Sequence, residues 1–370
     1  MAEYYSNSIS RKKRRKSKVY SGKTLALFLL DTIVSLAMVL LVFCTVATIV
    51  CQYISPEKSG VLSVVALGAP IIYLLDIVVM LDWIVRWRWY RASVMIVTVV
   101  LGLFYLSRYY KLDLERKYDT SYSERRYTKV LSYNVLEGKD DGLIQYIDKH
   151  NPDILCLQEM SGRANLAVLC EKYKSTKAEN DVASNQIFSR YKILRSGTVD
   201  SVARNGCVWA DLKIKDDTVR VVSLHLQSTS IRQEDTQFLE KHEYLRDKER
   251  EEKLRSIVER LVDNNRKRAL QADAIAAFLE KSPYKTIVCG DFNDVPLSYT
   301  YNRIARGFND TFSKMADGFV YTYDTKYRLL RIDNILVSPS IETISYEVNN
   351  DVKLSDHYPV VARLKIDADR

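Results

Sequence analysis

The chain has 370 residues, enough for one large domain or two ordinary ones, and a formal net charge of +9. Residues 1–127 hold 18 of the 55 Lys/Arg and 9 of the 46 Asp/Glu, which leaves 37 of each for residues 128–370. This balance removes the simple electrostatic argument for a DNA-binding protein, although a local basic groove is compatible with it. The six cysteines are spread singly without a C-x-x-C pair, so the sequence shows no zinc-site pattern and requires no disulfide.

A basic block, Arg11–Lys18, precedes a long apolar run over residues 24–50, in which Asp31 is the only charge. This run exceeds the roughly 20 residues that a membrane-spanning helix needs. Because the apolar part of a signal peptide is shorter and ends at a small-residue cleavage site, we predict an uncleaved anchor. The sequence divides into a basic tail (1–23), a membrane region (24–107, with spans at 24–50, 61–81 and 92–107) and a linker (108–126).

The bases that flank the spans indicate their orientation. With three crossings, Arg11–Lys18 and the arginine-rich loop 86–91 lie on the same side, whereas the loop 51–60 has Lys58 as its only base. We therefore predict an integral protein of the plasma or inner membrane, with a cytoplasmic N-terminus and everything after the third span on the other side. The basic residues just after that span oppose this orientation, but neighbouring acids dilute them. A nuclear-localisation or nucleic-acid role is the alternative for the basic block.

From Tyr127 onward, short β-branched runs alternate with helical stretches, which favours a layered α/β domain over 127–370. A helix is predicted over 143–149. Gln233–Glu280 is densely charged and helix-prone, and Asn264-Asn265 is expected to break it into two helices. The first of these fits a solvated surface helix, with a substrate-covering lid as the alternative. Strands are predicted over 129–135, 153–158, 187–193, 198–212, 218–226, 286–289, 332–337 and 360–366.

Polar side chains lie at or near the ends of these apolar strands, at positions far apart in the sequence. Each alone has an ordinary explanation as a turn former, a cap or a core histidine. Together they favour a functional site, because strand ends of an α/β sheet converge where ligands bind. Their carboxylates and amides suit Mg²⁺ or Mn²⁺, and their histidines supply the acid–base groups of phosphate ester hydrolysis. The set is Asn134, Glu159, His225, Asp291, Asn293, Asp333, Asp356 and His357.

The sequences around these residues resemble the endonuclease/exonuclease/phosphatase (DNase I-like) family, in the same order along the chain. The resemblance covers about residues 127–366, leaves the membrane region outside, and is far more specific for the family than for a substrate. It implies a four-layer αββα sandwich and divalent-metal hydrolysis of phosphodiesters or phosphomonoesters. The motifs are Leu131-Ser132-Tyr133-Asn134-Val135, Asp153-Ile154-Leu155-Cys156-Leu157-Gln158-Glu159, Ser223-Leu224-His225-Leu226, Gly290-Asp291-Phe292-Asn293, Arg331-Ile332-Asp333 and Ser355-Asp356-His357-Tyr358-Pro359.

The family's roles carry over to the matching positions. Glu159 resembles the chief ligand of Mg²⁺ or Mn²⁺, assisted by Asn134 and Asp356. Asp291 would position or deprotonate the attacking water, and Asn293 would orient this water and the phosphate.

The histidines take the remaining roles in this resemblance. His357, paired with Asp333, would act as an acid–base group or stabilise the crowded phosphorus centre, and His225 would hydrogen-bond a phosphate oxygen. Some nucleases of the family have an acidic partner for the histidine at position 225, and this sequence shows none before Ser189-Arg190. The loop 227–230 also lacks aromatic or basic residues for gripping nucleic acid.

The function expected from the sequence is thus a membrane-anchored metal-dependent phosphoesterase. Its substrate would be a lipid head group, a nucleic acid or a small phosphoester near the bilayer. A nuclease is the alternative within the same chemistry, and the uncharged balance of 128–370 predicts shallow salt dependence of any DNA binding. A non-catalytic membrane scaffold of the same fold is the alternative of another class, and the presence of every motif residue speaks against it.

Overall fold

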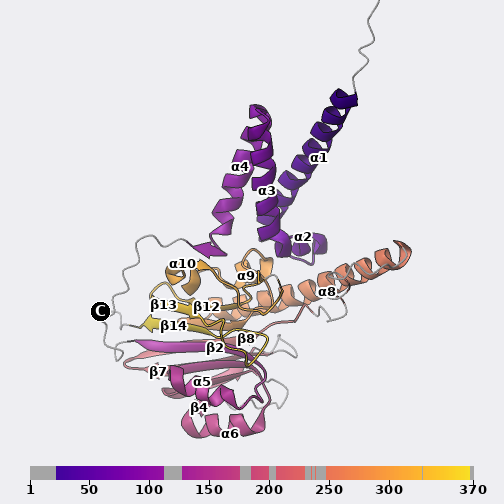
Figure 1. The fold of residues 1–370 in the computed structure, drawn as a ribbon. Helices are drawn as coiled ribbons and strands as arrows, with labels where there is room; N and C mark the ends of the chain where they lie inside the picture. Colours follow the sequence, from indigo (N-terminus) through magenta and orange to yellow (C-terminus); the bar gives the residue numbers. More distant parts are fainter. Residues whose placement is uncertain are drawn as a thin grey trace, which may run out of the picture.

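The computed structural model describes residues 22–111, 127–175, 185–199, 206–229, 247–326 and 328–366, together with Asp235 and Phe238. The predicted basic block and nearly all of the predicted linker lie outside these residues, as does most of the charged segment before position 247. The N-terminal part consists of helices, drawn in indigo to purple in Figure 1: α1 (Gly22–Val50), α2 (Gly60–Val65), a 3-10 turn (Ala66–Gly68), α3 (Ala69–Val85) and α4 (Trp89–Leu106).

Three helical stretches among the described residues are long and apolar enough to cross a membrane: Leu25–Val50, Gly60–Val85 and Trp89–Leu106. The second is longer than the predicted 61–81, because α2, the 3-10 turn and α3 follow one another directly. Pro70 does not end it, since this proline lies in the first turn of α3, where its missing N–H costs nothing.

Two acidic residues within these helices, Asp31 and Asp76, have partners outside their own helix. Asp76 is fully buried and accepts a hydrogen bond from Thr45 Oγ1 at 2.6 Å. Asp31 lies 3.0 Å from Arg91 and 3.3 Å from Arg88, both from the loop between α3 and the start of α4. These contacts connect the helices to one another.

Two six-stranded sheets form the centre of the remaining part. One sheet has the order β13-β14-β2-β3-β5-β4 and the other the order β10-β12-β9-β8-β7-β6. The first comprises β2 (Thr128–Glu137), β3 (Ile154–Met160), β4 (Lys174–Ser175), β5 (Gln186–Ser189), β13 (Glu342–Val348) and β14 (Val360–Lys365). The second comprises β6 (Lys192–Thr198), β7 (Cys207–Ile214), β8 (Asp217–His225), β9 (Lys285–Asp291), β10 (Asn309–Asp310) and β12 (Asp333–Val337).

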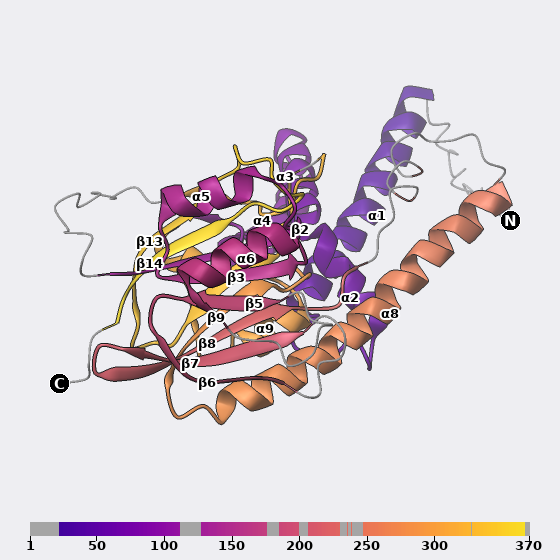
Figure 2. The same cartoon turned by 90° about the horizontal axis from the view of Figure 1, so that it is seen from below.

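Helices cover the outer faces of both sheets, as Figure 2 shows. The inner faces pack against each other through small and β-branched residues such as Val130, Cys156 and Val221. One outer face buries Leu131 and Leu155 beneath α5 (Gly142–His150) and α6 (Arg163–Lys172). The other packs against α8 (Asp247–Glu280) and α9 (Tyr299–Ile304). A short helix, α10 (Thr311–Met315), follows. This arrangement is the predicted four-layer αββα sandwich, which is therefore confirmed.

The predicted strand over 187–193 is wrong, because it is two strands in different sheets. β5 ends at Ser189, and β6 begins at Lys192 in the opposite sheet. Ser189 Oγ accepts from the backbone N–H of Tyr191 at 3.0 Å, which forms a local turn where the chain crosses over. The predicted strand over 198–212 is likewise misplaced, since residue 198 ends β6 and β7 begins at Cys207.

The predicted helix break at Asn264-Asn265 is also wrong, because α8 runs through both residues. Asparagine disfavours helix interiors when its side chain competes for the local backbone. Here the Asn264 amide donates to the carbonyl of Thr229 at 3.1 Å, and the Asn265 amide donates to Ser63 Oγ at 2.8 Å. Both asparagines are buried, and partners outside the helix occupy their amides. The N-terminal half of α8 extends beyond the sheets (Figure 2).

The N-terminal helices pack directly on the sandwich. Val295 and Leu297, in the loop after β9, share a buried apolar cluster with Cys51 and Tyr73. Arg108 Nη1, just after α4, donates to the carbonyl of Pro296 in the same loop at 3.1 Å. A strand of two residues, β1 (Tyr110–Lys111), pairs with β11 (Gly318–Phe319). Removing residues 1–111 would expose this apolar surface, so the two parts form one packed unit.

Candidate active site

Strands from both sheets end at one edge of the sandwich, and pairing fixes the positions of their polar residues. In the second sheet, Asp291 at the end of β9 pairs with His225 at the end of β8 and with Asp333 at the start of β12. In the first sheet, Asn134 on β2 pairs with Gln158, the residue before Glu159. The structure thus brings residues separated by up to 200 positions into one place.

Gly290 allows β8 and β9 to approach closely beside the site. Its φ is +133°, a conformation that residues with a side chain rarely adopt. A Cβ atom at this position would lie 1.9 Å from the carbonyl oxygen of Leu224 on β8. Since Leu224 and Gly290 directly precede His225 and Asp291, glycine is required for the spacing of these two functional side chains.

The backbone at Glu159 takes an unusual conformation that redirects its side chain. Its φ of +57° lies in the left-handed region, and the pairing of β2 with β3 is irregular between Asn134 and Glu137. The Glu159 side chain is 34% exposed, whereas Gln158 and Met160 on either side are buried. Such strain is costly and clusters at functional sites. Here it points a carboxylate toward the shared edge of the sheets.

Asp291 is the centre of the site and is 1% exposed. It accepts hydrogen bonds from the backbone N–H of Asn293 at 2.7 Å, from Asn293 Nδ2 at 3.0 Å and from Asn134 Nδ2 at 3.2 Å. Its Oδ2 also lies 3.6 Å from His225 Nε2 and 3.7 Å from His357 Nε2. One buried carboxylate therefore contacts four of the other predicted site residues.

Asn134 links the carboxylates of the two sheets. Its Nδ2 donates to Glu159 Oε1 at 3.0 Å as well as to Asp291, and its Oδ1 accepts from the backbone N–H of Leu136 at 3.2 Å. The amide nitrogen, not the oxygen, thus faces Glu159. A role as a metal ligand, predicted from the resemblance, would require the amide to rotate so that its oxygen faces the ion.

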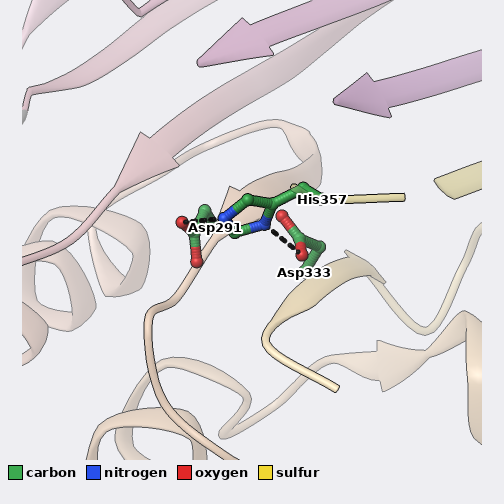
Figure 3. Close-up of side chains that lie close together, drawn as sticks. All are labelled: Asp291, Asp333 and His357. Carbon is green, nitrogen blue, oxygen red and sulfur yellow. Dashed lines mark hydrogen bonds and ion pairs between the residues drawn. The ribbon is translucent and has the colours of Figure 1, made fainter. Parts of the chain in front are cut away.

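His357 and Asp333 form a buried pair, shown with Asp291 in Figure 3. His357 Nδ1 lies 2.9 Å from Asp333 Oδ2. Burial by itself lowers the pKa of His357, but the negative charges of Asp333 and Asp291 outweigh it and raise the pKa to about 10. Burial raises the pKa of Asp333 to about 6, against the opposing effect of the histidine. At neutral pH the pair is an imidazolium held by a carboxylate.

Asp356 and Tyr323 border this pair. Asp356 is half-buried and accepts from Ser355 Oγ at 3.3 Å. The Tyr323 ring lies 4.8 Å from the His357 ring, centroid to centroid. Burial and then the charges of Asp356, Asp291 and Glu159 raise the pKa of Tyr323 to about 12. Tyr323 is a site residue that the sequence reasoning missed, because it lies in an irregular segment without a strand-end signal.

The donor atoms at this edge fit a hard divalent cation. Asp291, Asp333 and His357 each offer a ligand atom within 4.8 Å of the others, and Glu159 Oε1 shares two nitrogen neighbours, on Asn134 and His225, with Asp291. Two carboxylates so placed repel each other unless a cation or proton compensates them. Oxygen donors of this kind suit Mg²⁺ or Mn²⁺. Because Asp333 Oδ2 already binds the histidine and both Asp291 oxygens accept hydrogen bonds, the more exposed carboxylate of Glu159 is the better ligand.

We compared the sequence with models of known protein families. A family model described as the Endonuclease/Exonuclease/phosphatase family matches residues 131–357, more than half of the chain. The chain belongs to the endonuclease/exonuclease/phosphatase family. The resemblance inferred from the motifs is thereby confirmed, and members of this family are hydrolases of phosphoester bonds. A second model, a domain of unknown function, matches residues 31–109, which hold the apolar helices. No curated protein sequence matches the chain.

The solved structures that are similar to the chain show low sequence identity to it. TDP2 of D. rerio, humanized by 14 mutations, is 18% identical, with a TM-score of 0.47, and covers 65% of this chain and 100% of its own. D. rerio TDP2 complexed with a single-strand DNA product is 16% identical (TM-score 0.49, 65% and 99%). The human Nocturnin catalytic domain with a bound sulfate anion is 18% identical (TM-score 0.45, 65% and 94%).

Proposed function

We propose that this protein is a membrane-anchored, divalent-metal-dependent phosphoester hydrolase in which Asp291 activates the attacking water. The observation that carries the proposal is the position of Asp291: buried, and in contact with both site histidines and both site asparagines. A phosphoester hydrolase needs a cation, a group that activates water and a group that stabilises the departing oxygen. The site contains candidates for all three.

Glu159 would hold Mg²⁺ or Mn²⁺, with Asp356 and a rotated Asn134 amide as further ligands. The bound cation would offset negative charge on the phosphate and polarise its oxygens. The side chain of Glu159 is more exposed than those of Asp291 and Asp333. It can therefore reach an ion that is bound together with the substrate at the open edge of the site. No thiolate of the described residues contacts this group, which fits the preference for a hard ion over zinc.

Asp291 would orient the attacking water and take its proton, because it is the buried carboxylate to which the other site residues donate. The Asn293 side chain is fixed because its Nδ2 donates to Asp291 and to the carbonyl of Leu226 at 3.0 Å, so its Oδ1 would accept from the attacking water and orient it. His225 Nε2 lies 3.4 Å from Glu159 Oε1, so a phosphate oxygen that approaches beside Glu159 would come within reach of this donor.

The His357 imidazolium would stabilise charge that develops on the phosphate or on the leaving oxygen. Its Nδ1 is held by Asp333, which leaves Nε2 directed toward Asp291 and the open site. Asp333 therefore fixes the ring orientation and keeps the ring protonated. This division of work parallels general acid catalysis in other hydrolases, where a carboxylate orients the histidine.

The three apolar helices support membrane anchoring, and we propose a cytoplasmic N-terminus with the sandwich on the other side. A reporter fused after Arg370 tests this orientation, and reporter activity in the cytoplasm would overturn it. Anchoring restricts substrates to those in or near the bilayer, so a lipid head group is a candidate. A nuclease is the second candidate, and a steep loss of DNA binding with salt would favour it.

Chelation provides the first prediction. The full chain, purified in detergent because its two parts pack together, should lose roughly 10³-fold of its phosphodiesterase activity when EDTA removes divalent ions. Mg²⁺ or Mn²⁺ should restore it. The assay should offer a generic phosphodiester, DNA, RNA, sphingomyelin and phosphoinositides side by side.

A variant sharpens this test. Glu159→Gln should raise the metal concentration needed for half-maximal activity, because the amide is a weaker ligand than the carboxylate. Glu171→Gln, an exposed residue on α6, is the matched control and should behave as the wild type. Undiminished activity after exhaustive chelation would exclude metal dependence.

The His357–Asp333 pair predicts a pH effect. Because the pKa of His357 is raised, its protonated form persists at neutral pH and is lost as the pH rises through about 10. Asp333→Asn removes the carboxylate that raises this pKa, so the alkaline limb of the kcat/KM profile should move to lower pH by roughly one to three pH units. His357→Gln should remove that limb. An alkaline limb at the same pH in wild type and Asp333→Asn would contradict the assignment.

A further inference from the structure

A cavity of about 660 Å³ lies between the N-terminal helices and the sandwich, apart from the active site. Its walls come from Gln52 and Tyr53, just after α1, from Arg108, just after α4, and from residues 299–314 of the α9–α10 segment. Figure 1 shows α9 and α10 on the side of the sandwich that faces the apolar helices. The cavity therefore lies at the level where two of the three apolar helices end.

Four basic side chains line this cavity, and one of them is neutralised. Arg303 lies 2.9 Å from Asp273 and 2.9 Å from Glu280. Asp310, the acidic residue in the wall, is occupied by the buried Arg331 at 2.9 Å. Local ion pairs thus neutralise the charges of Arg303 and Asp310. The remaining bases are Arg108, Arg306 and Lys314.

These three bases have no carboxylate partner among the residues that the structure describes. Arg306 and Lys314 are exposed. Arg108 Nη1 donates to neutral oxygens only, on Gln52 at 2.8 Å and on Pro296 at 3.1 Å. Residues 128–370, which include Arg306 and Lys314, have no net charge, so the excess at these two positions does not follow from composition. Three uncompensated cations around one cavity favour binding of an anion.

Tyrosines accompany the bases. Tyr53 is 64% exposed and Tyr299 also lines the cavity. Tyrosine is enriched where a membrane meets water, because its ring is apolar and its hydroxyl is polar. Basic side chains close to a membrane surface attract the phosphates of anionic lipids, by about 1 kcal/mol for each base.

We propose that this cavity binds the phosphate of an anionic phospholipid head group, as a site separate from the catalytic centre. The proposal rests on the proposed membrane anchoring but not on phosphoester hydrolysis. Arg306 and Lys314 supply charge at the open side, and Arg108 supplies it next to the helix ends. A free phosphate would meet the same chemistry, so the test must separate the two sources.

Arg108 also connects this cavity to the loop that follows β9 and to the segment before Asp333. Its guanidinium holds the carbonyl of Pro296, and its own carbonyl accepts from Arg331 Nη2 at 3.1 Å, two residues before Asp333. Replacing Arg108 would therefore disturb the active site as well as the cavity. The experiment uses Arg306 and Lys314, which the structure shows without such contacts.

The test is lipid selectivity of the full chain in phosphatidylcholine vesicles, measured by electron spin resonance with spin-labelled phosphatidylglycerol or phosphatidylcholine. The wild type should immobilise phosphatidylglycerol in preference to phosphatidylcholine. Arg306→Gln combined with Lys314→Gln should reduce this preference by about fivefold for each base removed. The control, Lys192→Gln with Lys353→Gln, removes two exposed bases outside the cavity and should keep the wild-type preference.

Equal association of both lipids with the wild type would overturn the proposal, as would an unchanged preference in the Arg306/Lys314 variant. Excess glycerol 1-phosphate distinguishes the sources. If it abolishes the preference, the cavity binds a soluble phosphate and the lipid assignment is wrong. If the preference persists, the membrane lipid is the ligand. Hydrolytic activity does not enter this measurement, so loss of the proposed function would leave its result unaffected.

Discussion

Asp291→Asn should reduce kcat by roughly 10²- to 10⁴-fold, the usual contribution of a positioned general base. The substitution keeps the size of the side chain but removes the charge that takes the proton from water. It also leaves one of the donors now bonded to Asp291, from Asn293 or Asn134, without an acceptor, which should cost about 1–2 kcal/mol of stability. Activity is therefore measured well below the melting temperature of the variant.

The kinetic pattern separates catalysis from binding. Because the interaction is made with the attacking water, kcat and kcat/KM should fall together while KM changes little. Asp351→Asn, which alters an exposed aspartate in the turn before β14, is the matched control and should retain wild-type rates. A folded Asp291→Asn protein with activity within tenfold of the wild type would show that another group activates the water.

The sequence was sufficient to predict the fold and the residues at the strand ends. Apolar runs that end in Asn134, Glu159, His225 and Asp291 mark the edge of a sheet, and each run is continuous in the sequence. The structure places these four side chains within hydrogen-bonding or ion-pairing reach of one another. Their chemical roles stay predictions, because side-chain positions alone do not establish a reaction.

Contacts between distant segments could not be predicted in the same way. Asn264 and Asn265 lie within one continuous helix, where their side chains bond to Thr229 and Ser63. These partners are far away in the sequence, so the local pattern could not indicate them. Local propensity favoured a break there, and tertiary hydrogen bonds decided otherwise. Tyr323 was missed for a similar reason, since its neighbour His357 is 34 positions away and its own segment has no periodic pattern.

The contact between the apolar helices and the loop after β9 is a third feature that the sequence could not predict. Leu297 follows the Asp291–Asn293 motif closely, yet nothing in its own neighbourhood indicates that Cys51 Sγ donates to its carbonyl at 3.4 Å. The helices that resemble a simple anchor thus support the loop that follows Asp291. This explains why the isolated residues 127–370, which the motifs alone suggest as a natural unit, are not the appropriate protein for the assays.

Gly290→Ala should destabilise the protein by roughly 2–6 kcal/mol, from backbone strain and overpacking together, and abolish most of its activity. The new Cβ would lie 1.9 Å from the carbonyl oxygen of Leu224, so β8 and β9 must move apart. That movement separates His225 from Asp291. Because native domains are stable by only about 5–15 kcal/mol, a loss of this size should lower the melting temperature strongly.

Gly307→Ala is the matched control for this strand contact. Gly307 has a positive φ of +84°, but a Cβ there meets no atom within 4 Å. Its replacement should cost only the backbone strain, about 1 kcal/mol, and leave kcat unchanged. Thermal unfolding and kcat of both variants therefore separate strain from steric contact. If Gly290→Ala and Gly307→Ala lost equal stability and both kept wild-type activity, the close approach of β8 to β9 would not be what sets the spacing of the site.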